Sequence, residues 1–133
     1  MDRIVLDTNI ASLMHKGQLP VTLAAQLPPR RLALSFITVG ELTQWAEVQD
    51  WAERRRGRLD LLISQTLIVG GGEQEARLSG RVAAATRRRG RPRPPNDTWI
   101  AACCIANGFV LATHNVKDFG DFVDHHGLVL VSG

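Results

Sequence analysis

Several features that define common protein classes are missing from this sequence. The only two cysteines, Cys103 and Cys104, are adjacent, so they do not provide the spaced pairs of a disulfide framework or a zinc site. The N-terminus has no basic-then-apolar signal region, and no apolar run is long enough to cross a bilayer. Gly70–Gly72 is followed by Glu73 and lacks the Lys-Ser/Thr of a phosphate-binding loop. We therefore expect a cytoplasmic protein with no membrane contact.

The residues that are present suit one globular domain spanning 1–133. A length of 133 residues with 44% hydrophobic content is enough for a sizeable core. The formal net charge of +3 permits a polyanionic partner without requiring one. Arginines gather in two clusters, at 54–58 and 87–93, whereas the acids are mostly scattered singly. No repeat, linker or second domain is visible.

Short apolar segments alternate with helical patterns along the chain, which predicts an α/β domain with a mainly parallel sheet. The strands are expected at 4–6, 32–35, 66–69, 109–112 and 128–131. The helices are expected at 10–15, 20–27, 36–56 with Gly57 as an interruption, 59–64, 73–89 and 96–107. The last of these is expected to be capped by Asn96 or Asp97 at its start and by Gly108 at its end. We interpret Asp124–His126 as a surface loop.

Four acids follow strands or begin helices, and a parallel sheet brings such positions to one edge. They are Asp7, Glu41, Asp97 and Asp118. Each has a simpler explanation: Asp7 and Asp97 as helix caps, Glu41 as part of a Thr38–Glu41 capping box, and Asp118 as a loop acid. Ser35 is an alternative cap that would leave Glu41 in the second turn, free to face the crevice. Capping alone does not explain four acids at one edge.

Clustered carboxylates repel one another unless a cation neutralises them, and hard divalent cations with oxygen ligands do so. One such ion can activate a water, and two ions about 4 Å apart can clamp both oxygens of an in-line displacement. The arrangement favours metal-assisted phosphodiester hydrolysis. The number of ions stays open.

At this point the sequence resembles PIN-domain ribonucleases, and more narrowly VapC-type toxins of bacterial type II toxin–antitoxin pairs. Four segments carry the resemblance and span nearly the whole chain: 5–10 (VLDTNI), 35–42 (SFITVGEL), 91–102 (RPRPPNDTWIAA) and 111–119 (LATHNVKDF). The resemblance implies a three-layer α/β/α domain and an endoribonuclease. It also implies Mg²⁺, or Mn²⁺ as a substitute, a homodimer, and an antitoxin whose segment enters the active-site groove. The RNA substrate, transfer or ribosomal, is left open.

The resemblance implies, position by position, that the catalytic metal ligands are Asp7, Glu41, Asp97 and Asp118. Supporting roles fall to Thr8, Asn9, Thr113 and Asn115. His114 stands where an Arg is common, and either contacts a substrate phosphate or is mere variation. The candidate RNA-binding residues are Arg87, Arg88, Arg89, Arg91, Arg93 and His114. For the arginines, a solvated helix end is an equally good explanation.

Two other functions remain as alternatives. Leu6-Asp7-Thr8 is also compatible with a haloacid-dehalogenase-like phosphatase, but that family needs a second Asp where this chain has Asn9. A PIN-like module that binds RNA or a partner without turnover is the other alternative, and the intact set of acids argues against it.

Overall fold

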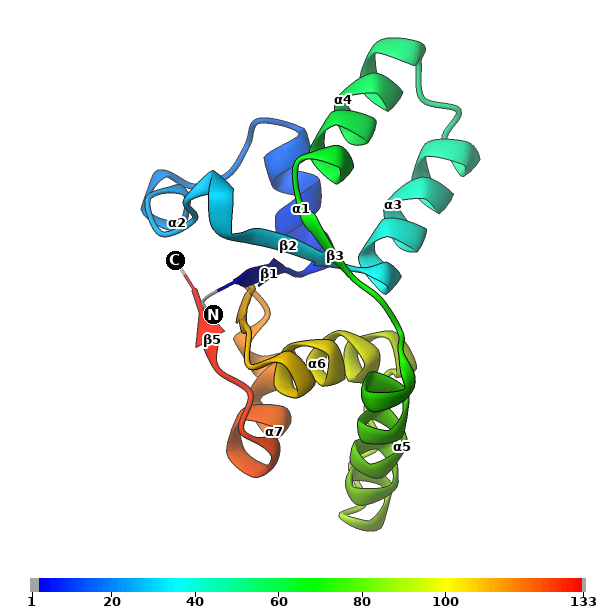
Figure 1. Cartoon of the computed structure of the whole chain (residues 1–133), viewed down its shortest axis with the longest axis vertical. Helices are drawn as coiled ribbons and strands as arrows, with labels where there is room; N and C mark the ends of the chain where they lie inside the picture. Colours follow the sequence, from blue (N-terminus) through cyan, green and yellow to red (C-terminus); the bar gives the residue numbers. More distant parts are fainter. Residues whose placement is uncertain (1–2, 133) are drawn as a thin grey trace.

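A computed structural model describes residues 3–132 of the chain, and its centre is a five-stranded sheet in the order β3-β2-β1-β4-β5. All four pairings are parallel. The central strand β1 is flanked by the strand that follows it in the chain on one side and by a late strand on the other (Figure 1). The chain therefore changes direction across the sheet at β1, and such a switch point leaves a crevice at the carboxyl ends of the strands. The strands are β1 (Ile4–Leu6), β2 (Leu32–Ser35), β3 (Leu67–Val69), β4 (Val110–Ala112) and β5 (Leu130–Val131).

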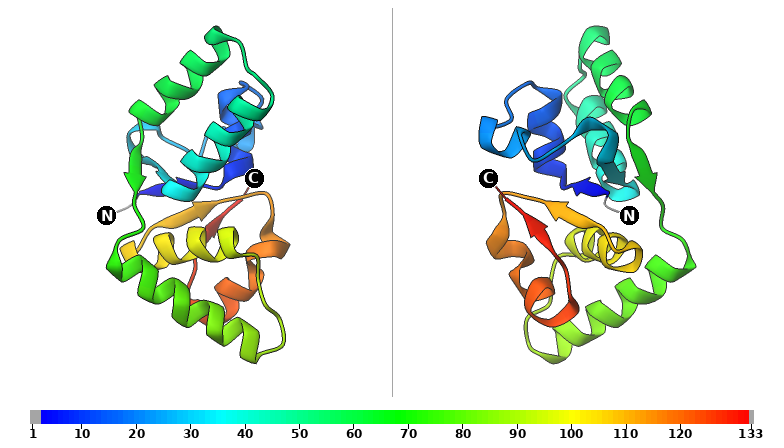
Figure 2. Two further views of the ribbon diagram at one scale, coloured as in Figure 1. Left: turned by 90° about the vertical axis from the view of Figure 1, so that its right-hand side faces the viewer. Right: turned by 60° about the vertical axis from the view of Figure 1, so that its left-hand side comes forward.

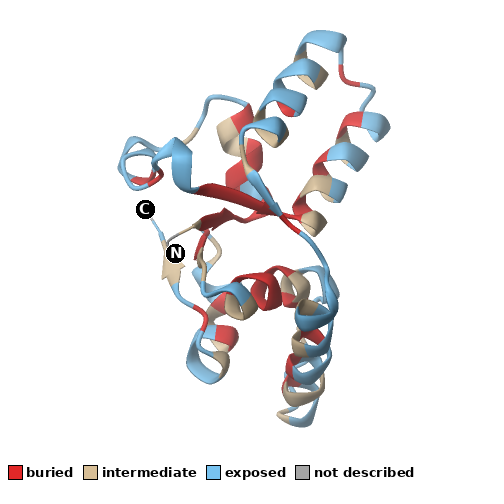
Figure 3. Ribbon diagram, viewed as in Figure 1, coloured by how far each residue is buried: buried red, intermediate tan, exposed pale blue. Residues whose placement is uncertain are grey.

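Alternating side chains of the strands enter two separate cores, one on each face of the sheet. Ile4 and Leu6 pack into one core, whereas Val5 between them packs into the other. Strands β1 and β2 are buried along their whole length (Figure 3). This explains why β1 is an uninterrupted apolar run: a parallel strand covered on both faces has no solvent side.

Helices cover both faces, which gives the expected three-layer α/β/α arrangement (Figures 1 and 2). One layer contains α1 (Thr8–His15), α2 (Val21–Ala24), the 3₁₀ turn η1 (Pro29–Arg31), α3 (Phe36–Val48) and α4 (Glu53–Ser64). The other contains α5 (Glu73–Arg88), α6 (Pro95–Asn107) and α7 (Val116–His126). Within residues 3–132, no helix is both long and apolar enough to span a membrane. The assignment of the chain to a single domain stays a prediction.

The long helix predicted from 36 to 56 is wrong, because the chain turns between α3 and α4. Asp50 has a φ of 47°, which no helix residue adopts, and the backbone N–H of Trp51 bonds back to the carbonyl of Ala46. The buried Trp51 ring stacks on His15 of α1, with ring centroids 5.0 Å apart. Burying this indole against α1 outweighs helix continuation. Gly57, the predicted interruption, lies inside α4.

Two expectations about the second half are also wrong. Helix α6 begins at Pro95, and neither Asn96 nor Asp97 caps it, because both lie inside the helix and Pro94 occupies the cap position. The segment 124–126 is the last turn of α7, a helix that buries Phe119 and Phe122. The predicted cap at Gly108 is confirmed, with a φ of 69°. Helix α2 is shorter than the predicted 20–27.

Candidate active site

A pocket of about 120 Å³ lies at the carboxyl edge of the sheet, where four elements meet. Asp7 follows β1, Glu41 lies in α3, and Asp97 and Asp118 lie in the first turns of α6 and α7. The structure therefore brings all four acids to one place, as the parallel topology requires. The lining is completed by Thr8, Asn9, Trp45, Ile100, Asn115 and Phe119.

Asp7 both caps a helix and belongs to the acidic pocket. Its carboxylate accepts a 2.7 Å hydrogen bond from the backbone N–H of Ile10 and caps α1. Its other oxygen accepts a hydrogen bond from the hydroxyl of Thr113, which in turn accepts one from the N–H of Asn115. Burial raises the pKa of Asp7 above its usual value, although these hydrogen bonds oppose the shift. The capping explanation and the pocket explanation therefore hold together.

Glu41 has no part in capping α3. The cap is Ser35, whose hydroxyl accepts a 3.2 Å hydrogen bond from the N–H of Thr38. This leaves Glu41 in the second turn, where it accepts hydrogen bonds from Thr8 at 2.7 Å and from Asn96 at 3.3 Å. The Glu41 carboxylate is thus held between Thr8, which follows Asp7, and Asn96, which precedes Asp97.

Asp97 shows the electrostatic consequence of this crowding. Burial raises its pKa, and the charges of Asp118, Glu41 and Asp7 raise it further. The charge of Arg93 acts in the opposite direction. Arg93 also donates a 3.0 Å hydrogen bond to the backbone carbonyl of Asp118, so it lies where the starts of α6 and α7 meet.

The donor set of the pocket suits a hard divalent cation, since it consists of carboxylate, hydroxyl and amide oxygens. Within residues 3–132, no group of three or more His, Cys, Asp or Glu side chains is already arranged to hold a metal ion. The mutual repulsion that raises the pKa of Asp97 is the unfavourable term that a bound cation would remove. The residue types of the pocket therefore suit a divalent cation.

Trp45 and Asn96 also belong to the surroundings of the four acids, although the sequence does not predict this. Trp45 is not among the site residues predicted from the sequence, yet it lines the pocket one turn after Glu41. The i, i+4 spacing on α3 was the signal that could have identified it. Asn96 was considered only as a helix cap, and its contact with Glu41 depends on how α6 packs against α3, which no local pattern reveals.

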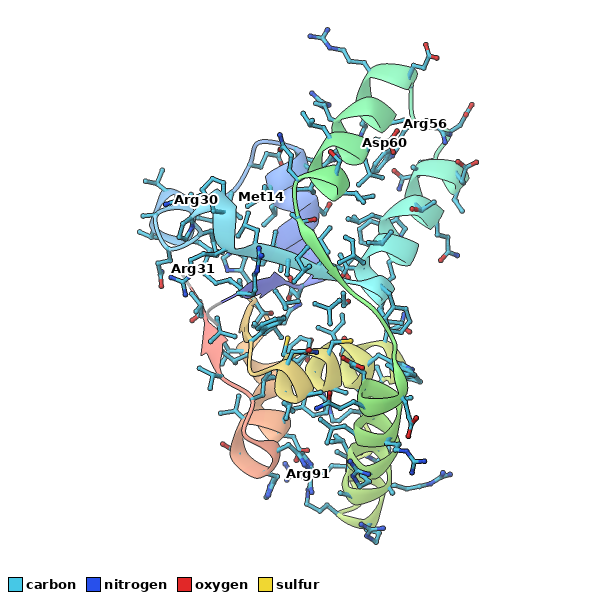
Figure 4. The ribbon with its side chains drawn as sticks, in the orientation of Figure 1. Met14, Arg30, Arg31, Arg56, Asp60 and Arg91 are labelled. Atoms are coloured by element: carbon cyan, nitrogen blue, oxygen red, sulfur yellow. The ribbon has the colours of Figure 1, made fainter. Side chains whose placement is uncertain are left out.

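The candidate RNA-binding residues lie in different environments. Arg89 is partly buried and is held by hydrogen bonds to Asp121 at 2.5 Å and to His126 at 3.0 Å. Arg87, Arg88 and Arg91 are exposed, and Arg91 lies at the end of the molecule where α5 and α7 approach each other (Figure 4). His114 is exposed too, and its charge lowers the pKa of Asp7. Arg93 and His114 are thus the members of this set with an electrostatic effect on the acids.

The protein is an α/β domain with a parallel sheet covered on both faces. Acids from four segments meet at the carboxyl edge of this sheet, an arrangement that suits phosphodiester chemistry. The family model of the PIN domain matches residues 4–122. Ribonuclease VapC1 of Haemophilus influenzae is 35% identical over 124 residues, which cover 90% of this chain and 92% of that protein. The tRNA(fMet)-specific endonuclease VapC of Shigella flexneri is 27% identical over 121 residues, covering 90% and 91%.

Solved structures agree with these sequence relatives. VapBC-1 from nontypeable Haemophilus influenzae superposes with a TM-score of 0.82 at 31% identity, covering 99% of this chain and 98% of that one. DNA-bound VapBC from Salmonella typhimurium superposes with a TM-score of 0.88 at 28% identity, with the same coverage. The chain therefore belongs to the PIN-domain family, within its group of VapC ribonucleases. The predicted family, fold class and ribonuclease activity are confirmed. Nucleases of this group are generally dependent on a divalent metal.

Proposed function

We propose that this chain is the toxin of a toxin–antitoxin pair and that it hydrolyses RNA phosphodiester bonds at the acidic pocket. The observation that carries this proposal is the meeting of Asp7, Glu41, Asp97 and Asp118, from four separate elements, around one pocket. Membership of the VapC group supports the same conclusion. The phosphatase alternative lacks its second acid, because Asn9 occupies that position.

Mg²⁺, with Mn²⁺ as a substitute, is the ion we propose for the four carboxylates. When bound there, it would activate a water for attack and polarise a phosphoryl oxygen of the scissile bond. Thr113 holds the Asp7 carboxylate and Thr8 holds that of Glu41, so both acids are fixed in orientation before substrate arrives. No side chain of the pocket is needed as a nucleophile.

The polar and aromatic residues of the rim are proposed to place the RNA. Asn9 and Asn115 line the pocket beside the acids and can hydrogen-bond a phosphate or ribose oxygen. The indole of Trp45 forms a wall on which a base can stack, which is the usual way for proteins to hold unpaired nucleotides. The exposed arginines of 87–91 add a positive charge that favours RNA approach.

The remaining assignments follow from the kind of protein proposed. Several of the structural neighbours are VapBC toxin–antitoxin complexes, and we propose an antitoxin partner here too, inserting into the pocket groove. We also propose one domain, a homodimer, and action in the cytoplasm, where the RNA substrate is found. The class of RNA, transfer or ribosomal, is a question for the cleavage assay.

The proposal is tested by assaying RNA cleavage by the purified chain, free of antitoxin, with and without Mg²⁺. We expect cleavage only with the ion, and none from Asp97→Asn. Asp60→Asn removes an exposed acid of α4 outside the pocket and serves as the matched control that should cleave normally. Equal activity of Asp97→Asn and wild type would overturn the proposal. RNA binding by the wild type without cleavage under any divalent ion would favour the silent binding module.

A further inference from the structure

A second hollow of about 330 Å³ lies between α5 and α6, on the opposite side of α6 from the acidic pocket. Helix α5 contributes Ala76, Gly80 and Ala83, which are exposed and carry nothing larger than a methyl group, together with the buried Ser79. A Cβ atom added at Gly80 would meet no atom within 4 Å. The hollow is therefore open at Gly80 of α5.

The wall opposite α5 includes an aromatic ring held in one orientation. Trp99 of α6 packs edge-to-face with Phe36 of α3, with ring centroids 5.1 Å apart and planes at 83°. Phe36 is itself confined, because a Cβ at Gly71 would lie only 2.8 Å from its ring. An indole fixed in this way loses little conformational freedom when another ring stacks on it.

Arg93 joins this hollow to the acidic pocket. Its side chain lines the hollow, while its Nη2 bonds the backbone carbonyl of Asp118, whose own side chain lines the pocket. The Nε of Arg93 is buried and has no hydrogen-bond partner within the described residues 3–132. The Arg93 side chain as a whole is only partly buried, and its guanidinium lies between the two hollows, where a planar cation suits a phosphate that links two nucleotides.

We propose that the α5–α6 hollow is a nucleotide subsite for single-stranded RNA, in which a base stacks on Trp99 and Arg93 binds a phosphate between this base and the acidic pocket. This subsite rests on the proposed ribonuclease function. An aromatic ring beside a cation, next to a phosphodiester site, is the combination that binds unpaired nucleotides. Arg81 and Arg87 are exposed on α5, the helix that borders the hollow.

The decisive variant fills the hollow without removing any contact. Gly80→Leu places a side chain in the open space that the base would occupy. Gly57→Leu is its matched control, because Gly57 is also an exposed helical glycine with nothing within 4 Å, but lies on α4 outside the hollow. Trp99→Leu removes the stacking ring, and Trp99→Phe keeps a smaller one. All are made in the full chain and compared on a short random-sequence single-stranded RNA with Mg²⁺.

We expect Gly80→Leu and Trp99→Leu to raise KM about tenfold, the effect of losing one base–aromatic stack, with little change in kcat. Trp99→Phe should lie between wild type and Trp99→Leu, and Gly57→Leu should match the wild type. In an Asp97→Asn background that does not cleave, fluorescence polarisation should show the same loss of affinity for this RNA.

Unchanged KM and affinity in Gly80→Leu would overturn the subsite. So would a change in oligomeric state on light scattering without a change in KM, because a second copy of the chain would then occupy the hollow. Failure of the ribonuclease function itself is a distinct result, recognised by an inactive wild type. The polarisation measurement then still decides whether the hollow binds RNA.

Discussion

Asp7 has two roles, as the cap of α1 and as a charged residue of the acidic pocket, and substitutions affect the two roles differently. Its carboxylate caps α1 through Ile10 and adds a buried charge to the acidic pocket. Alanine removes both, and loss of such a cap costs about 1 kcal/mol. Asparagine keeps an oxygen for the cap and removes the charge, and its NH2 group replaces the oxygen that accepts from Thr113. We expect both variants to lose cleavage, but Asp7→Asn to be at least as stable as wild type without metal and about 1 kcal/mol more stable than Asp7→Ala. Urea unfolding in a chelator measures this.

The pH dependence of stability in wild type and Asp7→Asn tests the same explanation. Burial raises the folded-state pKa of Asp7 above 3.8. Stability contributed by such a group is fully present below the unfolded pKa and is lost as pH rises through the folded pKa. The stability advantage of Asp7→Asn over wild type should therefore be small near pH 3.8 and should grow towards neutral pH. An advantage that is constant with pH would contradict a buried, raised-pKa carboxylate.

Trp45 gives the second prediction at this scale. Its indole lines the acidic pocket and is only partly buried, so it has surface available to substrate. We expect Trp45→Leu to raise KM for single-stranded RNA about tenfold and Trp45→Phe to raise it much less, because phenylalanine still offers a stacking face. Thermal unfolding of both variants separates this effect from lost packing. A wild-type KM in both variants would show that Trp45 serves only the core.

For individual helices and strands, the sequence pattern predicts an element correctly where residues within a few positions of one another determine it. The strand at 4–6 follows from an apolar run buried on both faces, and the start of α3 follows from Ser35 as its cap. The end of α3 could not be predicted, because it depends on Trp51 stacking on His15, a residue 36 positions earlier in the chain. The placement of Asp7 and Glu41 in one pocket was predictable only through the parallel topology.

Arg56, a member of the arginine cluster 54–58, connects α3 and α4. It lies on α4 facing α3 (Figure 4) and donates to the carbonyls of Trp51 and Ala46, at 2.7 Å and 3.0 Å. A third bond reaches the carboxylate of Glu47 at 2.5 Å. The guanidinium thus closes the turn between the two helices, and the arginine cluster 54–58 is not uniformly solvated.

Arg56→Leu should therefore destabilise the protein by about 1–3 kcal/mol, since two carbonyls at the turn lose their charged donor. Arg54→Leu, an exposed neighbour on the same helix, is the control and should change stability by less than about 0.5 kcal/mol. The urea midpoint reports both. Comparable losses in the two variants would mean that charge, not the hydrogen bonds of Arg56, stabilises this helix pair.

At the scale of the whole molecule, the acidic pocket draws on both helical layers. Asp7 and Glu41 lie at or in the layer that contains α1 and α3, whereas Asp97 and Asp118 belong to α6 and α7 on the other face of the sheet. Besides the sheet, the contact between Asn96 and Glu41 connects the two sets. A cation shared by these carboxylates would therefore join the two layers across the edge of the sheet.

This arrangement predicts that Mg²⁺ stabilises the entire fold in the absence of RNA. A ligand that binds only the folded chain adds about 2.7 kcal/mol at a concentration 100 times its Kd. We expect Tm to rise with Mg²⁺ concentration in the wild type, and to rise little in Asp97→Asn or Glu41→Gln, each of which removes one charge from a different layer. Asp60→Asn should respond like the wild type, because Asp60 is exposed on α4. A response that survives Glu41→Gln but not Asp97→Asn would place the ion within one layer only. Equal responses in all four proteins would show that Mg²⁺ acts outside the pocket.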